Sequence, residues 1–336
     1  MNGPEAEGGP VDEFDWIARH LRPLAAGAPE ALGLLDDAAV LPARPGFDLI
    51  VSKDAIVEGV HFLPSDPLDL VARKLLRVNL SDLAAKGAEP YGYFLAVAWP
   101  PRCGWSERRR FVEGLAADQA EFGLKLFGGD TVSTPGPLTA SVTVLGWAPA
   151  GEMVRRGAAR AGDVVLVTGT IGDGGLGLAA AKGEAMGLAG DDLAWLKGRY
   201  QVPRPRLVMR EALLRWAHAA VDVSDGLIAD AGRIATASGV RIKLDLERMP
   251  ISPAAEAWLG VQPDPAAARL GLAAAGDDYE VICTVPPSSA PALKVAAEAA
   301  GLRLTEIGAV VTGQGVTVRI NGQSVAVPRS GWRHGG

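Results

Sequence analysis

The chain has 336 residues, of which 48% are hydrophobic and 21% charged, so it can bury a sizeable core, and its length predicts two domains. Its formal net charge of −6 argues against a nucleic-acid-binding surface. Cys103 and Cys283 fit no zinc or redox spacing and favour a reducing compartment. Residues 1–11 indicate a loose tail without a signal peptide, and no apolar run is long enough to span a bilayer, so we expect a cytoplasmic protein with no membrane partner.

The first unusual feature is a pair of carboxylates, Asp36 and Asp37, inside the apolar segment 32–40, which follows a helix predicted over 11–21 with Asp12 as its cap. Charged groups rarely stand in such a segment unless their desolvation is compensated. A surface turn between two short strands explains the pair equally well.

Residues 48–62 predict a short buried strand over 49–51 that ends in polar groups, Ser52 and Asp54. A strand that delivers a hydroxyl and a carboxylate at its end is a common way to build an oxygen-ligand site. A strand that runs into an ordinary surface turn is the alternative.

A helix is predicted from Pro67 to Gly87, with Asp66 as N-cap. Its interior is apolar on nearly every side, which indicates burial, and Asn79 and Asp82 share one face of it. A buried carboxylate needs a partner or a cation, so Asp82 is a stronger site candidate than the Asp36–Asp37 pair.

The rest of the first half predicts strands and helices in alternation, at 91–99, 106–123, 124–127 and 138–146. The third of these is followed by Gly128-Gly129-Asp130-Thr131. Two glycines let a backbone approach a ligand closely, and an acidic residue follows at once. A Walker loop is excluded because Gly-Lys-Ser/Thr is missing.

We place a domain boundary near residue 150, which predicts a tail at 1–11, a first domain at 12–149 and a second at 150–336. A strand at 164–167 leads into the glycine-rich stretch 169–177, a weak signal that strand–turn–helix packing explains as well. The remaining elements expected are helices at 204–218 and 289–300, and strands at 219–223, 240–246, 279–285, 304–311 and 316–320.

The strand at 219–223 leads to the second acidic group of the chain, Asp222, Ser224 and Asp225. For Asp225 the residues themselves favour the N-cap of the next helix over a ligand, unless the acidic residues of the first half need completing. Asn321-Gly322 predicts a hairpin turn, and Trp332 near the end of the chain needs a packing or stacking partner.

Isolated aspartates after apolar strands or on a buried helix suit a hard cation with oxygen ligands, and Mg²⁺ bridging phosphates is the natural choice. No zinc spacing, no Ser-His-Asp arrangement and no Cys–His pair is visible. The shortage of general bases is informative, because phosphoryl transfer to an anionic acceptor needs positioning, metal ions and a cationic side chain and no base.

Six motifs in this order resemble the thiamine-monophosphate kinase family of the aminoimidazole-ribonucleotide synthetase superfamily, from about residue 12 to Trp332. They are Asp36-Asp37-Ala-Ala-Val, Ser52-Lys53-Asp54 with His61-Phe62, Asn79-Leu-Ser-Asp82, Gly128-Gly129-Asp130-Thr131, Asp222-Val-Ser224-Asp225-Gly226 and Gly276-Asp277-Asp278-Tyr279-Glu280. Each motif is weak alone, but six in register are specific.

The resemblance implies an α/β fold of two domains: an N-terminal mixed sheet with helices that forms a homodimer, and a C-terminal α/β domain. It implies transfer of the ATP γ-phosphoryl to thiamine phosphate with several Mg²⁺ ions. The implied metal ligands are Asp37, Ser52, Asp54, Asp82, Asp130, Asp222 and Asp225. The implied ATP contacts are Gly129, Asp130, Arg156 and Ser224, the implied substrate contacts are His61, Asp277 and Trp332, and the implied catalytic residues are Asp54, Asp130 and Arg156.

The chain departs from the family pattern at four positions. Leu35 stands where Gly is usual before the acidic pair, Lys53 replaces Thr and Asp277 replaces Glu. Val112 stands where a Tyr often lies near the nucleotide, so that contact is not carried over.

The related enzymes selenophosphate synthetase and the hydrogenase-maturation protein need a reactive Cys near the N-terminus and at the C-terminus, respectively, and neither occurs here. A relative that binds nucleotide or a partner without turnover is the alternative from another class.

Overall fold

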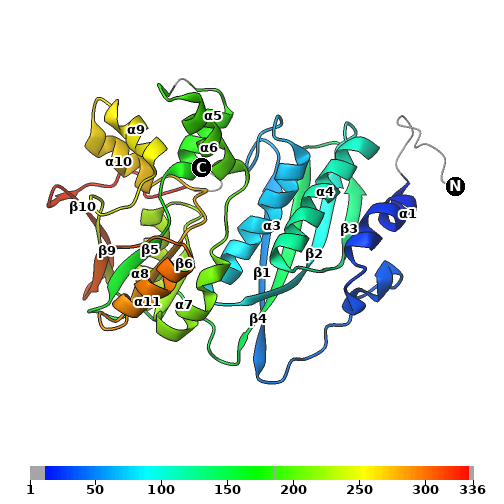
Figure 1. The fold of residues 1–336 in the computed structure, drawn as a ribbon, viewed down its shortest axis with the longest axis horizontal. Helices are drawn as coiled ribbons and strands as arrows, with labels where there is room; N and C mark the ends of the chain where they lie inside the picture. The colour runs from blue at the N-terminus through cyan, green and yellow to red at the C-terminus, as the bar shows by residue number, and fades with distance from the viewer. Residues whose placement is uncertain (1–11, 185, 333–336) are drawn as a thin grey trace. The chain divides into compact units, whose positions relative to one another are not determined.

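The computed structural model describes residues 12–184 and 186–332, so the tail predicted over 1–11 lies outside the described residues. By its internal contacts the chain divides into two compact units. Unit 1 comprises residues 1–80 and 90–150, and unit 2 comprises residues 81–89 and 151–336. Each unit has its own β-sheet (Figure 1).

The sheet of unit 1 has four strands in the order β1-β4-β2-β3. β1 and β4 are antiparallel, whereas β2 and β3 are parallel, so the sheet is mixed as expected. Its strands are β1 (Phe47–Val57), β2 (Glu89–Trp99), β3 (Leu126–Ser133) and β4 (Thr139–Pro149).

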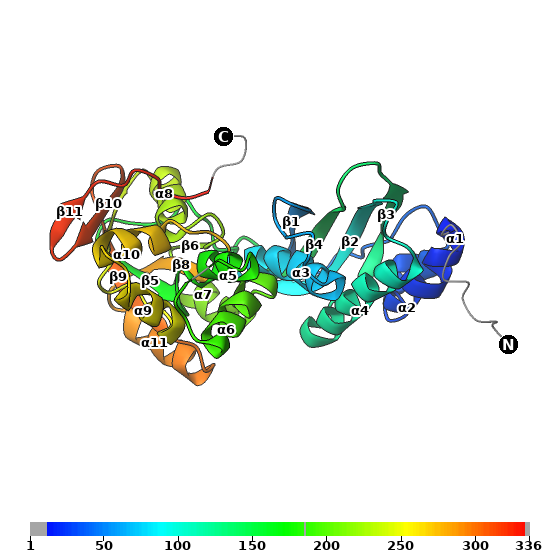
Figure 2. The ribbon, with the colours of Figure 1, turned by 90° about the horizontal axis from the view of Figure 1, so that it is seen from above.

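Two helices, α3 (Leu68–Ala85) and α4 (Trp105–Phe122), cover one face of this sheet (Figures 1 and 2). α4 begins where the Glu107 side chain accepts from the Gly104 N–H at 3.0 Å, and it ends at Gly123 in the left-handed conformation, φ 67°. Phe111 and Leu115 on its inner side are fully buried. The predicted helix over 106–123 is therefore confirmed.

The other face of the sheet is partly covered by the N-terminal segment. A small apolar cluster joins Ala25, Ala28 and Ala31 to Phe127 and Leu145. The elements of this segment are α1 (Glu13–Trp16), the π-helix η1 (Ile17–Leu21), α2 (Arg22–Leu24) and the 3₁₀ helix η2 (Pro29–Leu34). Asp12 caps α1 as predicted, because its Oδ1 accepts from the Asp15 N–H at 3.0 Å.

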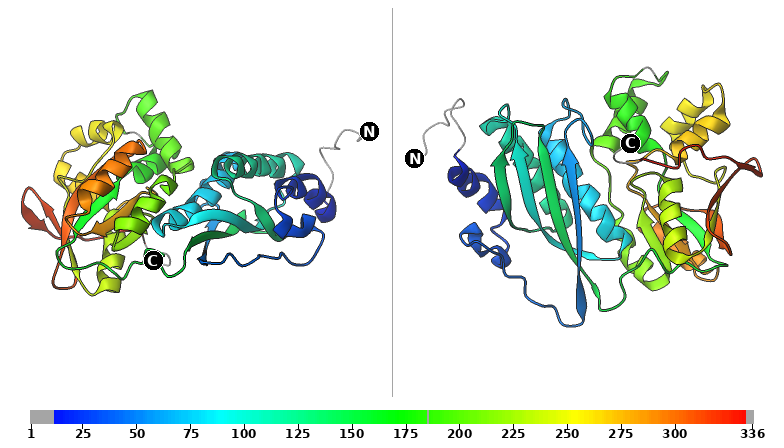
Figure 3. Two further views of the ribbon diagram at one scale, coloured as in Figure 1. Left: turned by 60° about the horizontal axis from the view of Figure 1, so that its bottom comes forward. Right: turned by 180° about the vertical axis from the view of Figure 1, so that it is seen from behind.

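Along β1 this second face is open (Figure 3, right). Val51 on β1 is 55% exposed, and Val132 on β3 is 50% exposed. Exposed apolar side chains on a sheet face suggest that another surface covers it.

Two strand boundaries differ from the prediction. β1 extends to Val57, so Ser52 and Asp54 lie within the strand and not after it. β3 runs from Leu126 to Ser133 and therefore contains Gly129 and Asp130. In both cases pairing with a neighbouring strand continues through polar residues, which hydropathy alone does not reveal.

Unit 2 contains a seven-stranded sheet in the order β11-β10-β7-β9-β5-β8-β6. Among its described strands, β10 and β7 pair in parallel, whereas the pairs β10–β11, β5–β8, β5–β9, β6–β8 and β7–β9 are antiparallel. The strands are β5 (Val164–Thr168), β6 (Ala219–Asp222), β7 (Arg241–Asp245), β8 (Val281–Val285), β9 (Leu304–Val311), β10 (Gly315–Ile320) and β11 (Gln323–Val325).

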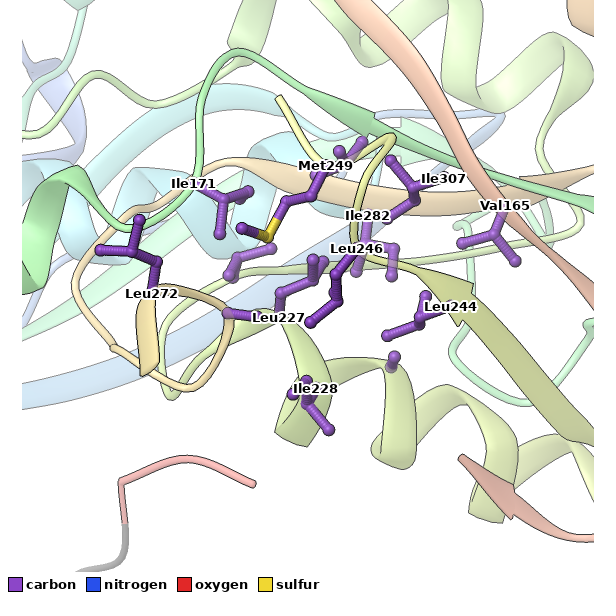
Figure 4. Packing of buried hydrophobic residues seen from close by; sticks show 14 of the residues in the cluster. Val165, Ile171, Leu227, Ile228, Leu244, Leu246, Met249, Leu272, Ile282 and Ile307 are labelled. Atoms are coloured by element: carbon purple, nitrogen blue, oxygen red, sulfur yellow. The ribbon is translucent and has the colours of Figure 1, made fainter. Parts of the chain in front are cut away.

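Both faces of this sheet are buried, so successive strand residues enter different cores. Val165 and Val167 of β5 belong to a core with Leu227 and Ile228 of α8 (Figure 4), whereas Leu166 belongs to a second core. The helices around the sheet are α5 (Asp173–Ala181), α6 (Gly190–Gln201), η3 (Leu207–Met209), α7 (Arg210–Trp216), α8 (Leu227–Ser238), α9 (Pro253–Gly260), α10 (Pro265–Ala273) and α11 (Ala290–Ala299). A sheet buried on both faces explains the continuous apolar runs in the sequence.

The hairpin predicted at Asn321-Gly322 is confirmed, since β10 and β11 pair antiparallel around these two residues (Figure 2). Both residues have positive φ, 52° and 72°, as a tight hairpin turn requires. Helices α6, α9 and α10 were not predicted. Among the described residues, no helix is both long and apolar enough to cross a membrane.

Candidate active site

One pocket of unit 1, about 350 Å³ in volume, gathers two of the acidic motifs. Asp37, Gly129 and Asp130 all line it. Phe94 and Phe127 contribute to an apolar wall. A pocket with an apolar wall and carboxylates in its lining suits a ligand that has both an aromatic part and a charged part.

Gly129 is needed because two backbones approach closely. A Cβ atom on Gly129 would lie 1.7 Å from the Leu95 carbonyl oxygen on β2, a distance that no side chain can accept. The neighbouring Asp130 is exposed, and its Oδ1 accepts from the Thr131 N–H at 2.9 Å. The glycine thus allows β3 to carry an accessible carboxylate at the pocket.

Ser52 and Asp54 lie at the opposite edge of the same sheet. β4 and β2 separate β1 from β3, and strand spacing puts these edges about 14 Å apart. Buried Asn79 on α3 accepts from the Asp54 N–H at 3.0 Å and so fixes the backbone there. Unit 1 of one chain therefore does not bring Asp54 and Asp130 together.

His61 is held by two contacts in unit 1. The Val57 N–H donates to its Nδ1 at 3.0 Å, so the proton of the neutral ring sits on Nε2. Lys74, only 2% exposed, donates to the His61 carbonyl oxygen at 3.0 Å. His61 therefore carries its proton on Nε2, and Lys74 fixes its backbone.

In unit 2 the turn 223–226 after β6 is the centre of the predicted site. The Asp277 N–H donates to the Ser224 carbonyl oxygen at 2.9 Å, and the Trp332 N–H donates to the Asp225 carbonyl oxygen at 2.8 Å. Two segments far apart in the sequence thus meet the same turn, and both carry a predicted substrate contact.

Glycines make these close approaches possible. A Cβ on Gly276 would lie 2.6 Å from the Ser224 carbonyl oxygen, and one on Gly331 would lie 2.4 Å from the Asp225 carbonyl oxygen. The Trp332 side chain is 48% exposed, and the Arg329 guanidinium carbon lies 5.5 Å from the centre of its ring.

Asp225 does not cap α8, so the capping alternative is wrong: the residue at the N-cap is Gly226, and the Asp225 carboxylate pairs with Arg233. The turn is held by Asp230 of α8, whose Oδ2 accepts from the Ser224 and Asp225 N–H groups, each at 3.0 Å. Burial raises the pKa of Asp230 to about 6, against the lowering effect of the Arg233 charge.

A second group of charges lies where β6 ends. Asp222 is 4% exposed, and burial raises its pKa well above the usual value, with further contributions from the charges of Asp82 and Asp230. Lys86 donates to the Ala220 carbonyl oxygen at 2.8 Å. Burial and the charge of exposed Arg156 lower the pKa of Lys86 to about 8, while Asp222 and Asp82 act in the opposite direction. Carboxylates that repel each other in this way would be relieved by a bound cation.

Sequence reasoning missed Lys86, Asp230 and Lys74, which hold parts of this site. Lys86 directly follows the last residue of α3, and a Lys at the C-terminal end of a helix is common for reasons of helix stability alone. The sequence offered one signal for Asp230, which is that this second acidic residue stands five positions after Asp225.

No group of three or more His, Cys, Asp or Glu side chains in 12–184 and 186–332 is placed to hold a metal by itself. The site residues divide between the units: Asp37, Ser52, Asp54, His61, Gly129 and Asp130 are in unit 1, and Asp82, Arg156, Asp222, Ser224, Asp225, Asp277 and Trp332 are in unit 2.

The structure shows the surroundings of two of the residues that depart from the family pattern. Leu35 is 76% exposed and follows three residues with positive φ, from Leu32 to Leu34. Val112 is 8% exposed on α4 and is not among the residues that line the pocket.

Comparisons with known proteins cover nearly the whole chain. Residues 35–148 match the family of AIR synthase related protein, N-terminal domain, and residues 160–321 match AIR synthase related protein, C-terminal domain. The thiamine-monophosphate kinase of Caulobacter vibrioides is 57% identical over 326 residues, which cover 97% of this chain and 92% of that protein.

Solved structures agree with this result. The crystal structure of thiamine-monophosphate kinase from Stenotrophomonas maltophilia K279a is 36% identical with a TM-score of 0.81, covering 94% of this chain and 98% of that one. The structure of AaThiL complexed with AMPPCP and TMP is 29% identical with a TM-score of 0.76, covering 87% and 89%. The two-domain α/β fold expected from the motifs is therefore confirmed, and the chain belongs to the thiamine-monophosphate kinase family.

Proposed function

We infer that this protein transfers the γ-phosphoryl group of ATP to thiamine phosphate, giving thiamine diphosphate and ADP. The observation that carries the inference is that all six motifs lie on a fold shared, over 87% of the chain, with a relative solved with AMPPCP and TMP. The relative from Caulobacter vibrioides, at 57% identity, has the same activity in its name.

The chemistry requires charge stabilisation and no general base. Because the acceptor phosphate is already anionic at neutral pH, no proton must be removed before it attacks the γ-phosphorus. We assign Arg156, exposed near Lys86, to balance the charge that develops on the phosphoryl oxygens. Asp54 and Asp130 would hold the cations that balance the charge of the phosphates.

We propose several Mg²⁺ ions as the cations, with Asp37, Ser52, Asp54, Asp82, Asp130, Asp222 and Asp225 as their ligands. The donor set fits, because all are hard oxygen ligands, and the negative charge of Asp82 adds to burial in raising the pKa of Asp222. Mg²⁺ usually takes only one or two protein carboxylates and completes its shell with water and phosphate oxygens. Bound Mg²⁺ would neutralise the phosphates of ATP.

For ATP we propose contacts with Gly129, Asp130, Arg156 and Ser224. The pocket of about 350 Å³ beside Gly129 and Asp130 has an apolar wall that suits the adenine base. Ser224 is partly exposed on the 223–226 turn, next to the carboxylates of unit 2.

For thiamine phosphate we propose His61, Asp277 and Trp332. The Nε2–H of His61 is a suitable donor to a phosphate oxygen. The carboxylate of Asp277 and the half-exposed ring of Trp332 suit a cationic aromatic substrate.

Trp332→Ala is expected to raise the KM for thiamine phosphate about tenfold, because a cation–aromatic contact is worth roughly 1–2 kcal/mol when partly desolvated. The KM for ATP should change by less than about twofold, and Trp195→Ala, on another exposed Trp, serves as control. Steady-state kinetics measure both constants. An unchanged KM for thiamine phosphate would remove Trp332 from the substrate site.

We also propose a homodimer formed through the open face of the unit 1 sheet. Exposed Val51 and Val132 lie on this face, and Asp54 and Asp130 lie at opposite edges of the sheet. In a two-fold dimer the Asp54 edge of one copy can meet the Asp130 edge of the other, so that each site takes residues from both copies.

Mixing Asp54→Asn with Asp130→Asn after reversible dissociation is expected to restore about a quarter of the wild-type activity. Half of the re-formed dimers are mixed, and each mixed dimer has one intact site of two. Each variant alone stays inactive and serves as control. No recovery, although mass spectrometry shows mixed dimers, would contradict shared sites, and a monomeric wild-type protein would contradict the dimer.

The reaction itself is tested by following ADP release. We expect Mg²⁺-dependent release with thiamine phosphate, none with thiamine and only a trace with water as acceptor. Equal release with water would favour an ATPase, and nucleotide binding without release would favour the non-catalytic alternative.

For location we propose the cytoplasm, since Cys103 and Cys283 are both free and buried, as in a reducing compartment.

A further inference from the structure

The turn 276–280, which carries Asp277, has a strained backbone. Asp277 and Tyr279 both have left-handed φ values, 67° and 51°. Residues other than Gly, Asn and Asp adopt this region at a cost, and such a conformation persists only where its surroundings enforce it. The contacts around this turn should therefore fix the position of the Asp277 carboxylate.

Asp278, between these two residues with left-handed φ values, anchors the turn to α5. Its side chain is buried, and it accepts from the Gly172 N–H at 2.8 Å and the Gly174 N–H at 2.9 Å. The glycine-rich stretch thus offers its helix N-terminus to a carboxylate of the protein's own chain. A Cβ on Gly174 would lie 2.4 Å from the Asp277 carbonyl oxygen, so α5 packs directly against the turn.

Arg199 of α6 connects the middle of the turn to its end. Its guanidinium donates to the Asp278 carbonyl oxygen at 3.2 Å and to Glu280 Oε1 at 2.9 Å. Glu280 is fully buried and also accepts from the Thr168 hydroxyl at 2.7 Å and from Arg206 Nε at 2.5 Å. Arg199 is thus tied both to the backbone of the turn and to a fixed anion.

We propose that Arg199 is a positioning residue for substrate binding, which holds the strained 276–280 turn so that Asp277 faces thiamine phosphate. The proposal rests on the substrate role of Asp277 under the proposed function. Arg199 itself does not touch substrate. It acts on the Asp278 carbonyl group, one residue from Asp277.

Arg206 offers a matched control in the same unit. Arg199 and Arg206 side chains are 14% and 13% exposed, and both donate to buried Glu280. Arg199 also binds the turn backbone at the Asp278 carbonyl oxygen, whereas the Arg206 guanidinium binds the Glu280 carboxylate. Each substitution removes one partner of Glu280, so both should lower the melting temperature to a similar extent. The Arg199 substitution alone releases the turn.

Isothermal titration with thiamine phosphate, without ATP or Mg²⁺, is expected to show binding to Arg199→Met about tenfold weaker than to the wild type. Binding to Arg206→Met should stay within about twofold of the wild type. In steady-state kinetics Arg199→Met should raise the KM for thiamine phosphate, leave the KM for ATP within about twofold and change kcat less than KM. If Arg199→Met does not fold, Arg199→Lys carries the same test, because the Lys side chain ends one bond short of the Nη2 atom that donates both hydrogen bonds.

Equal losses of affinity in the Arg199 and Arg206 variants, or none in either, would overturn the positioning role. A parallel rise in both KM values for Arg199→Met would also overturn it, since that indicates a general structural defect. Failure of the proposed function is a separate result: in that case the wild-type protein itself does not bind thiamine phosphate.

Discussion

Replacing Asp130 by Asn is expected to lower kcat more than about 100-fold while the protein still folds. Asp130 is exposed on β3 and lines the pocket together with Asp37. The substitution keeps the size of the side chain and an oxygen that can accept from the Thr131 N–H, a contact of 2.9 Å in the structure. It removes the negative charge that we assign to a Mg²⁺ ion carrying ATP, so the loss should appear in turnover.

Two measurements separate this outcome from a folding defect. Thermal melting should shift by less than about 2 °C, because exposed substitutions usually change stability by at most 0.5 kcal/mol. The Mg²⁺ concentration for half-maximal ADP release should rise. Ser133→Ala, exposed three residues further along β3, should behave like the wild type. If the cooperative melt of Asp130→Asn is lost, Asp130 is a structural residue and our assignment is wrong.

Replacing Asp118 by Ala is expected to cause the largest loss of stability, about 3–5 kcal/mol of the free energy of unfolding of unit 1. Asp118 on α4 is fully buried and accepts from Arg73 Nε at 2.8 Å and Arg77 Nε at 2.7 Å on α3. Arg77 is only 4% exposed, so the substitution leaves its charge buried without this partner. The cost arises from that uncompensated charge more than from the lost contact.

Glu121→Ala is the matched control for Asp118→Ala. The Glu121 side chain pairs with the same two arginines but is 40% exposed, so its loss should cost less than about 1 kcal/mol. Urea denaturation followed by Trp fluorescence measures both variants. Equal midpoints for the two variants would show that burial of Asp118 does not set the strength of this network.

The sequence by itself determined most of the strands, the long helices of unit 1 and the candidate site residues. Buried strands such as β5 and β8 are continuous apolar runs, and α4 has a helical period and a glycine stop, so local patterns predict them well. The six motifs also identified the family, because residue types and their spacing are read directly from the sequence, however far apart the residues lie in the folded chain. Local patterns failed where polar residues lie inside a strand, as Asp54 and Asp130 do.

Only the tertiary structure decided which of these residues meet. It placed Asp54 and Asp130 on opposite edges of one sheet, and it joined the segments of Asp277 and Trp332 to a single turn after β6. It also revealed Arg199, whose partner Glu280 lies 81 positions along the chain. Hydrogen bonds and ion pairs over such separations depend on how the strands are ordered and the helices packed, and neither leaves a periodic signal in the amino-acid sequence.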